Sequence, residues 1–524
     1  MKSLNIFFQY KLAIVLVVLS FISCSKDNND PNPFETTVTT SDFSKTMDEN
    51  PSDGYVIGTV SGTTNQGSVT FSITEQTPAN AFDIDTASGE LKVLNKVLFD
   101  YETNPTITGT IKVANGLVVK NALVRITLND LVEENIYDGD VILRSQQEVD
   151  DFGANNYTYI NGFLNIGKYF DNEISDINDL SPLSSLTLIN KDLIVGLNPI
   201  LQNLQGLENI THIEGQLIII QNESLASIES LINVDDFYNN ITITENHNLI
   251  NLNGLDNFEK AIGINIVDNN SLENIDGLSN IIQVYSVYIG HNPLLSNILG
   301  LRNITEAQGG ISIGNNDSLQ SIEGLENMTI LGDHLAIFEN ELILNIDSLQ
   351  NLVSFPNDVN IRDNLSLQSI SGLKGIQIAG KLLIWNNPAL NNLDGLNEVT
   401  NVTSELLISN NNVQNLDELS NLTSVITISI KFNSRLENIE GLSNLQTVSK
   451  FMRIQNNSLI TNLDSLSNLT TVGRNLTIHD NQNLSNFCGL QTLIIGNGLG
   501  EDFFAYGNAY NPTKQDIIDG NCSL

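Results

Sequence analysis

The sequence is poor in the residues that usually carry catalysis, metal binding and nucleic-acid recognition. Three of its 524 residues are cysteine and five are histidine, which excludes a disulfide-dense scaffold and a four-cysteine zinc site. Lys and Arg number 23 against 61 Asp and Glu, and the resulting net charge of −38 is expected to repel nucleic acid and anionic lipid. Charged residues make up only 16% of the chain, whereas hydrophobic residues make up 41%. This composition favours a folded protein over a disordered acidic one.

Long apolar runs are also scarce. One run of 11 residues, Leu12–Ile22, follows Lys2 and Lys11 and is too short to cross a hydrocarbon core of about 30 Å. The run fits the apolar centre of a signal peptide that covers residues 1–23. No later stretch is long and apolar enough to span a membrane, so no membrane-spanning helix is expected.

The end of this segment carries a possible anchor. Residues 21–24 read Phe-Ile-Ser-Cys and resemble the lipobox of bacterial lipoproteins, with Phe21 where that family usually has Leu. The acidic residues that follow resemble the surface-export signal of Bacteroidetes lipoproteins and begin a flexible linker over 24–40. The resemblance implies a lipid on Cys24 as the membrane anchor, and hence an outer-membrane protein exposed at the cell surface. The alternative is an ordinary secretory signal with an incidental cysteine.

Residues 41–133 alternate between apolar and polar side chains with a period of two, and turn residues interrupt them at short intervals. Val69–Ile73, Gly109–Val113 and Ala122–Leu128 are predicted strands. The spacing predicts a small antiparallel β-sandwich of about 90 residues. Four motifs within it resemble a cadherin repeat in order and spacing: Asp48–Asn50, Phe82–Leu91, Leu98–Glu102 and Ile126–Asp130.

The cadherin resemblance implies a calcium site. Cadherin repeats bind Ca²⁺ at their junctions through carboxylates, and Ca²⁺ takes six to eight oxygen ligands. By this resemblance the ligands would be Glu49, Asp100, Glu102 and Asp130. Asn115 and Val132 depart from the family pattern, and the chain has one such repeat. A sandwich that binds no Ca²⁺ is therefore the alternative.

Residues 155–490 repeat with a period of 23 or 24 residues. The repeat is anchored by a Leu that follows Gly, Ser or Glu, at Leu207, Leu231, Leu255, Leu278, Leu301, Leu325, Leu349, Leu373, Leu396, Leu419, Leu442, Leu466 and Leu490. An Asn lies nine residues before every anchor, and apolar residues lie 14 and 12 residues before it, except that Glu405 takes the first apolar position in one repeat. Each repeat is predicted to form one strand and one Asn turn, and stacked repeats would share a continuous core.

This pattern is similar to leucine-rich repeats, and most similar to the receptor L-domain of growth-factor receptors. The resemblance implies an all-β chain in which a cadherin-like sandwich precedes a solenoid of about 13–14 coils with end caps. Residues 134–154, in which Ser145–Glu148 is a capping-box pattern, are the expected N-terminal cap. Residues 491–524 are the expected C-terminal cap. Cys488 and Cys522 are predicted to form a disulfide there, with two free thiols as the alternative.

Binding is favoured over catalysis. The sequence contains no nucleophile elbow, zinc-protease motif or P-loop. Gly496–Gly500 mimics part of a dinucleotide fingerprint but has no βαβ unit around it, and no two histidines share a register within the repeat. The chain is therefore interpreted as a non-enzymatic surface adhesion protein with an unknown protein or glycan ligand. A carbohydrate-active enzyme, a glycan-binding accessory protein and a structural stalk are the alternatives.

The same register predicts a binding surface. Residues 11 before each anchor should point outward and lie about 4.8 Å from their neighbours in the next coil. The predicted row is Gly196, Ile220, Thr244, Val267, Gly290, Gly314, Phe338, Arg362, Trp385, Ile408, Lys431, Gln455 and His479. Phe338, Arg362, Trp385 and Lys431 are the candidate ligand-binding residues, because aromatic and Arg side chains dominate binding hot spots. The alternative is that this row is covered, or that Trp385 packs only against Arg362.

Overall fold

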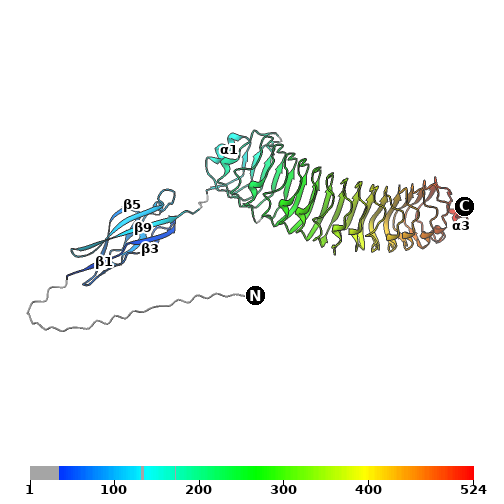
Figure 1. The fold of residues 1–524 in the computed structure, drawn as a ribbon. Coiled ribbons are helices and arrows are strands. Elements are labelled where there is room, and N and C mark those ends of the chain that lie inside the picture. The colour runs from blue at the N-terminus through cyan, green and yellow to red at the C-terminus, as the bar shows by residue number, and fades with distance from the viewer. Residues whose placement is uncertain (1–34, 132–134, 172, 236) are drawn as a thin grey trace, which may run out of the picture. The chain divides into compact units, whose positions relative to one another are not determined.

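A computed structural model describes residues 35–131, 135–171, 173–235 and 237–524 (Figure 1). The predicted signal peptide and Cys24 lie outside the described residues. The chain divides into two compact units, Met1–Glu133 and Glu134–Leu524. Within the described ranges, none of the helices has the length and apolar character needed to cross a bilayer.

The first unit is a sandwich of short strands around one core. Its elements are β1 (Val38–Thr40), β2 (Phe43–Asp48), β3 (Val56–Thr59), β4 (Gly62–Thr64), β5 (Thr70–Thr77), β6 (Phe82–Ile84), β7 (Glu90–Val93), η1 (Lys96–Leu98), β8 (Thr106–Asn115) and β9 (Val118–Asn129). One sheet has the order β2-β9-β8-β5, another β3-β7-β6, and β1 pairs with β4. Phe82, Phe99 and Ile107 are fully buried between them.

One pairing in this unit departs from the predicted antiparallel sandwich. β2 pairs with β9 in parallel, with Phe43 opposite Val124 and Asp48 opposite Asn129. β2 and β9 come from the beginning and the end of the unit's sequence. No tight turn connects them, so they are not forced to be antiparallel. β8 and β9 do form a hairpin and are antiparallel.

The second unit contains one long parallel sheet of 19 strands and a short parallel sheet of four. The strands of the long sheet follow one another along the length of the unit (Figure 1). The short sheet contains β10 (Ile136–Tyr137), β12 (Tyr159–Ile160), β14 (Leu188–Ile189) and β16 (His212–Ile213). The long sheet contains β11 (Val141–Leu143), β13 (Leu164–Gly167), β15 (Leu193–Gly196), β17 (Leu217–Ile220), β18 (Ile241–Thr244), β19 (Lys260–Val267), β20 (Gln283–Gly290), β21 (Glu306–Gly314), β22 (Ile330–Leu331), β23 (His334–Phe338), β24 (Asp358–Arg362), β25 (Ile378–Trp385), β26 (Asn401–Ser409), β27 (Ser424–Lys431), β28 (Thr447–Val448), β29 (Met452–Gln455), β30 (Thr471–Val472), β31 (Leu476–His479) and β32 (Phe503–Tyr506).

Short 3₁₀ helices lie on the side of the repeats away from the long sheet, and many of them end at an anchor Leu. They are η2 (Ser181–Leu183), η3 (Glu229–Leu231), η4 (Asp276–Leu278), η5 (Leu299–Leu301), η6 (Asp347–Leu349), η7 (Ser371–Leu373), η8 (Asp417–Leu419), η9 (Glu440–Leu442), η10 (Asp464–Asn468) and η11 (Cys488–Leu490). The anchor Leu and the two inward strand residues of each repeat share one core; Leu217, Ile219 and Leu231, for example, are fully buried. No repeat could bury these side chains alone.

The Asn residues form a buried ladder along the unit. Asn222 is typical: its backbone N–H donates to Oδ1 of Asn246 over 3.2 Å, and its Nδ2 donates to the carbonyl oxygen of Val195 over 2.9 Å. The members are Asn198, Asn222, Asn246, Asn269, Asn292, Asn316, Asn340, Asn364, Asn387, Asn411, Asn433, Asn457, Asn481 and Asn508. These bonds satisfy backbone groups that would otherwise be buried without partners.

The ladder corrects the predicted register in one repeat. Asn411 occupies the ladder where the spacing predicted Asn410, and Leu406 and Ile408 point into the core. The strand pairing shifts between Val402 and Glu405, so the following residues are displaced by one position. Ile408 therefore does not belong to the outward row; Ser409 takes its place beside Trp385.

A left-handed residue precedes each ladder Asn. The φ angles lie between 54° and 60° at Leu197, Gln221, Glu245, Asp268, His291, Asn315, Glu339, Asp363, Asn386, Asn410, Phe432, Asn456 and Asp480. Residues other than glycine rarely adopt this backbone conformation. The hydrogen bonds made by the ladder Asn that follows hold the backbone in it. The chain turns sharply there, so these side chains lie at the edge of the strand surface.

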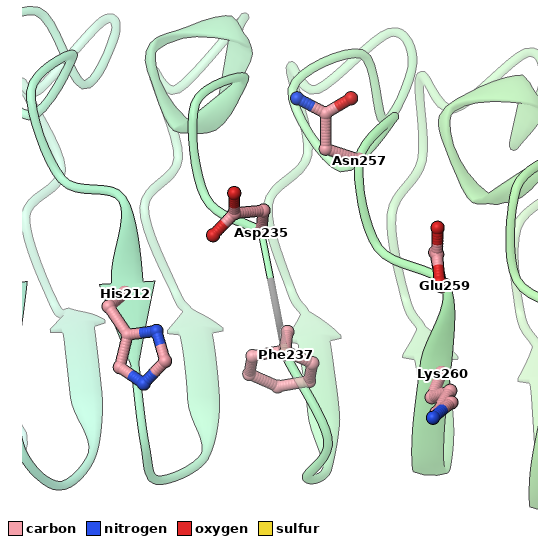
Figure 2. Close-up of a pocket in the computed structure, with 6 residues that line it drawn as sticks. All are labelled: His212, Asp235, Phe237, Asn257, Glu259 and Lys260. Atoms are coloured by element: carbon pink, nitrogen blue, oxygen red, sulfur yellow. The ribbon is translucent and has the colours of Figure 1, made fainter.

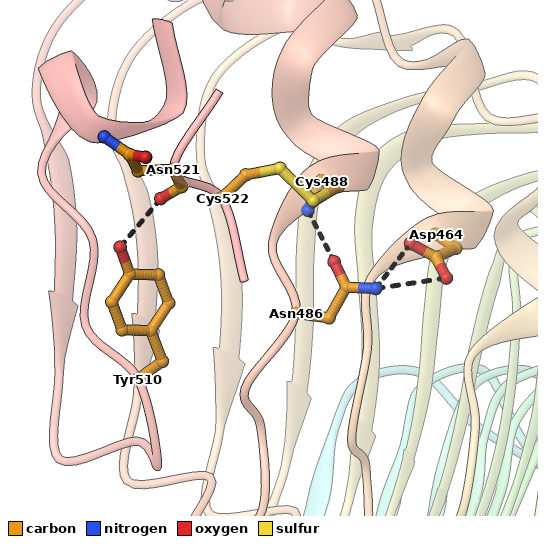
Figure 3. Close-up of a disulfide and its surroundings, with 6 residues drawn as sticks. All are labelled: Asp464, Asn486, Cys488, Tyr510, Asn521 and Cys522. Carbon is orange, nitrogen blue, oxygen red and sulfur yellow. Dashed lines mark hydrogen bonds between the residues drawn. A yellow bond between two sulfur atoms is a disulfide. The ribbon is translucent and has the colours of Figure 1, made fainter. Parts of the chain in front are cut away.

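Both ends of the long sheet extend beyond the predicted repeat. At the start, β11 pairs with β13 and is followed by α1 (Gln146–Gly153), in which Ser145 Oγ accepts a hydrogen bond from the backbone N–H of Glu148. At the other end, β32 pairs with β31, next to α2 (Gln491–Ile495) and α3 (Lys514–Ile518). Cys488 and Cys522 form a disulfide whose Cα atoms are 4.9 Å apart (Figure 3).

Candidate functional site

Three acidic side chains meet at one end of the first unit. The carboxylate oxygens of Glu49, Asp100 and Glu102 lie within 4.8 Å of one another; these residues are called the acidic cluster below. Glu49 follows β2 and is 3% exposed. Its two carboxylate oxygens accept hydrogen bonds from the backbone N–H groups of Tyr101 and Leu131, over 2.6 and 2.7 Å. These two bonds compensate for burying a carboxylate.

The acidic cluster contains three of the four predicted calcium ligands. Asp130 is exposed and does not belong to the group, because the chain after β9 turns its backbone toward Glu49 and donates the N–H of Leu131. Hard carboxylate oxygens suit Ca²⁺, but three carboxylates supply fewer than the six to eight ligands that it takes. The residues fit part of a calcium site whose remaining ligands must be other oxygen atoms or water.

On the second unit, three of the four predicted ligand-binding residues are in contact. Phe338, Arg362 and Trp385 lie opposite one another on the neighbouring strands β23, β24 and β25, and are called the aromatic strip below. The Cζ atom of Arg362 lies 4.5 Å from the centroid of the Phe338 ring and 5.5 Å from that of Trp385. All three side chains are half-buried.

The charge of Arg362 is already balanced. Its Nη1 pairs with Glu339 and, over 2.7 Å, with Asp363; both acids come from the left-handed column at the strand ends. Burial alone would lower the pKa of Arg362, but its hydrogen bonds to Asp363 and Glu339 raise that pKa instead. The aromatic strip therefore presents two rings and a neutralised guanidinium.

Lys431 does not join this stack. Ser409 lies between Trp385 and Lys431 in the strand register. Lys431 makes no ion pair with any residue that the structure describes. It is a separate cation on the same surface, near Arg453 of β29, rather than part of a four-residue contact.

A polar pocket of about 420 Å³ opens on the same surface. Its functional side chains are Thr242, Asn265, Ser286, Tyr288, Ser312 and His334, which come from β18 to β23; this group is called the polar pocket below. Its lining contains no Asp, Glu, Lys or Arg. The sequence expectations did not include this pocket, because they rested on aromatic and charged residues. The available signal was a run of hydroxyl and amide side chains 13 residues before successive anchors.

A larger pocket of about 510 Å³ lies among the loops that lead into the strands (Figure 2). His212, Asp235, Asn257, Glu259 and Lys260 line it from neighbouring repeats. The ring nitrogen Nε2 of His212 engages Glu214, over 2.9 Å, instead of another lining residue. Over the described part of the chain, the acidic cluster is the one group of three or more potential metal ligands this close together.

Comparison with known proteins gives weak structural similarities. No protein-family model and no curated protein matches the sequence. Among solved structures, domains 3-6 of protocadherin gamma B2 match at 18% identity and a TM-score of 0.17, over 19% of this chain and 23% of that one. Mouse cadherin-23 EC22-24 matches at 18% identity and a TM-score of 0.16, over 21% and 38%. Human protocadherin-24 EC1-2 matches at 17% identity and a TM-score of 0.16, over 21% and 53%. The chain thus spans about half or less of each of these structures, and TM-scores this low carry no functional argument.

Proposed function

We propose that the protein is a lipid-anchored binding or adhesion protein of the cell surface. It would present the strand surface of residues 134–524 to a protein or glycan ligand, without catalysing a reaction. The repeats are proposed to be of the leucine-rich type, similar to a receptor L-domain. Cys24 would carry the lipid and hold the protein in the outer membrane.

One observation about charge supports this proposal most strongly. The sheet face is defined here as the last two outward residues of each strand paired in register from β13 to β32. These positions contain no Asp or Glu but do contain Arg362, Lys431 and Arg453. The nearest strand carboxylates, Asp358 and Glu405, lie at a third outward position of β24 and β26, next to Lys381. A pair of outward rows without carboxylates, which carries aromatic and basic side chains, favours contact with another molecule.

The test uses residues 25–524, screened against glycan and protein arrays. Where a ligand binds, the double variant Phe338→Ala/Trp385→Ala is expected to weaken binding at least about tenfold, because aromatic anchors dominate hot spots. Tyr238→Ala is the matched control, since Tyr238 is an exposed aromatic residue (55%) that belongs to no strand. Equal binding by wild type, double variant and control would remove the aromatic strip from the site.

The anchor has its own test. Cys24→Ser is expected to release the protein from the membrane fraction. Without the cysteine that accepts the lipid, the protein has no acyl chain to anchor it. Normal membrane retention of Cys24→Ser would contradict the anchoring proposal.

A second proposed function is weak Ca²⁺ binding in the first unit, and the observation that favours it is the acidic cluster. Glu49, Asp100 and Glu102 would hold the ion with oxygen atoms alone, as Ca²⁺ prefers. Ca²⁺ would offset two of the three negative charges of the acidic cluster and stiffen the end of the first unit that holds it.

A further inference from the structure

We propose that the polar pocket binds an uncharged oligosaccharide, which deepens the proposed function by naming a ligand class and its subsite. The pocket is carried by strands β18 to β21, whose register places Thr242, Asn265, Tyr288 and Ser312 in one straight row. Adjacent strands are about 4.8 Å apart, so the row offers a hydroxyl, an amide, a phenol and a hydroxyl at even spacing.

Two glycines lie beside this row of polar side chains. Gly290 and Gly314 occupy the neighbouring outward row, where a side chain would fill the space. A Cβ at Gly290 would lie 2.9 Å from the Tyr288 hydroxyl oxygen, and one at Gly314 would lie 2.3 Å from the Phe338 ring. The absence of both side chains lets Tyr288 and Phe338 lie against the sheet. The rings therefore lie beside the row. An aromatic face can pack against the apolar face of a sugar ring while the polar side chains bind its hydroxyl groups.

The polar groups of the pocket are available to a ligand. Ser312 Oγ and His334 Nε2 are 3.0 Å apart and form a hydrogen bond. In the described parts of the chain, the side chains of Thr242, Asn265 and Tyr288 form no hydrogen bond, and all three are half-buried. Hydroxyl and amide groups both donate and accept, as sugar hydroxyls do. A sugar hydroxyl can replace a water molecule at groups of this kind with equivalent hydrogen bonds.

Charge selects the class of ligand. A charged ligand would find no fixed partner of opposite sign in a lining without Asp, Glu, Lys or Arg. The net charge of −38 further disfavours anions, and cations would meet far more favourable surroundings at the acidic pocket around Glu339, Glu341 and Asp363. A neutral, hydroxyl-rich chain is the ligand whose chemistry the row matches. None of the three residues of the aromatic strip, which begins at Phe338, lines the polar pocket.

The experiment titrates residues 25–524 by calorimetry with four probes: a maltooligosaccharide, a cellooligosaccharide, a chitooligosaccharide and a heparin oligosaccharide. At least one neutral probe is expected to bind. Asn265→Ala and Tyr288→Ala should each weaken it about tenfold, because each removes hydrogen bonds or ring contact made only in the complex. Tyr238→Ala, outside the sheet, should bind as the wild type does. Circular dichroism of each variant checks that it is folded.

The outcomes separate this inference from the proposed function. Failure of every neutral probe at millimolar concentration overturns the inference, as does binding of the heparin probe alone. Neutral binding that Asn265→Ala and Tyr288→Ala leave unchanged also overturns it, since the sugar then lies elsewhere. Binding of an array protein that depends on Phe338 and Trp385 in the same preparation would sustain the proposed function in each of these cases. Binding of no ligand of any class would overturn both.

Discussion

The guanidinium of Arg362 stacks on the ring of Phe338, with Cζ 4.5 Å from the ring centroid. Trp385 closes the stack from the other side, and Glu339 and Asp363 pair with the same guanidinium nitrogen. A surface arginine with this many partners is held in one orientation. The aromatic strip is therefore preorganised, which lowers the entropy that a ligand would have to remove on binding.

Replacement of Arg362 should be visible in tryptophan fluorescence. Trp385 is the one Trp of the chain, so its emission reports on this stack alone. Arg362→Ala is expected to shift that emission to the red and to destabilise the second unit by about 1 kcal/mol, the scale of a half-buried cation–π contact. Arg362→Lys should restore only part of the effect, because an ammonium cannot stack as a planar group does. Arg453→Ala, on the same face without a ring partner, is the control, and an equal shift there would contradict the stack.

The Asn ladder makes a prediction about two adjacent residues. Asn411→Gly should lower the free energy of unfolding by about 2 kcal/mol more than Asn410→Gly. The loss of the Asn411 side chain leaves the backbone N–H of Asn387 and the carbonyl oxygen of Ile384 without their buried partner. Gly suits the left-handed conformation of Asn410, where φ is 54°. Urea denaturation of both variants gives the comparison. If Asn410→Gly lowers the free energy of unfolding as much or more, Asn410 is the ladder residue, as the spacing predicted.

This repeat shows why the sequence could not settle every position. Anchor spacing is sufficient to place most ladder residues, since a 23 or 24 residue period leaves one Asn at the right offset. Between Leu396 and Leu419 three successive Asn residues, 410–412, fit the turn about equally well, and the anchor spacing does not change. The deciding feature is the shift in strand pairing after Val402. Such a shift depends on hydrogen bonds to the next strand and leaves no mark in the spacing.

The candidate sites divide in the same way. The row that contains Phe338, Arg362 and Trp385 follows from strand alternation, which is a local property. The pairing of Arg362 with Glu339 depends on a left-handed turn in another repeat, and the exclusion of Asp130 from the acidic cluster depends on how the chain leaves β9. These are contacts between segments, and alternation carries no information about them.

Calcium binding is expected to depend on Glu102 and not on Asp130. Glu102→Gln removes one of three clustered carboxylates and should raise the dissociation constant at least about tenfold, because Ca²⁺ affinity follows the charge of its ligands. Asp130→Asn changes an exposed carboxylate outside the cluster and should leave the titration as in the wild type. Calorimetry measures both. Extracellular calcium modules have dissociation constants below about 10 mM. If the wild type gives no heat of binding at about 10 mM Ca²⁺, the proposed site is rejected.

The stability of the second unit should depend on pH through Glu418, the central residue of η8. Burial raises the pKa of Glu418 above its usual 4.5, and the nearby carboxylates of Asp394 and Asp417 raise it further. The folded protein therefore holds this proton to higher pH than the unfolded chain does. Its stabilising effect is fully present below about pH 4.5 and is lost as the pH rises through the pKa of the folded state.

Glu418→Gln isolates this effect, because the amide stays neutral at every pH. The variant is expected to melt at a higher temperature than the wild type at pH 7, and the two melting temperatures should converge as the pH falls below about 4.5. Glu437→Gln, which changes an exposed acid in the next repeat, controls for the loss of one negative charge from an acidic protein. A lower melting temperature for Glu418→Gln at pH 7 would show that ionised Glu418 has a favourable partner. A pH-independent difference would show that packing, rather than the proton, distinguishes the two proteins.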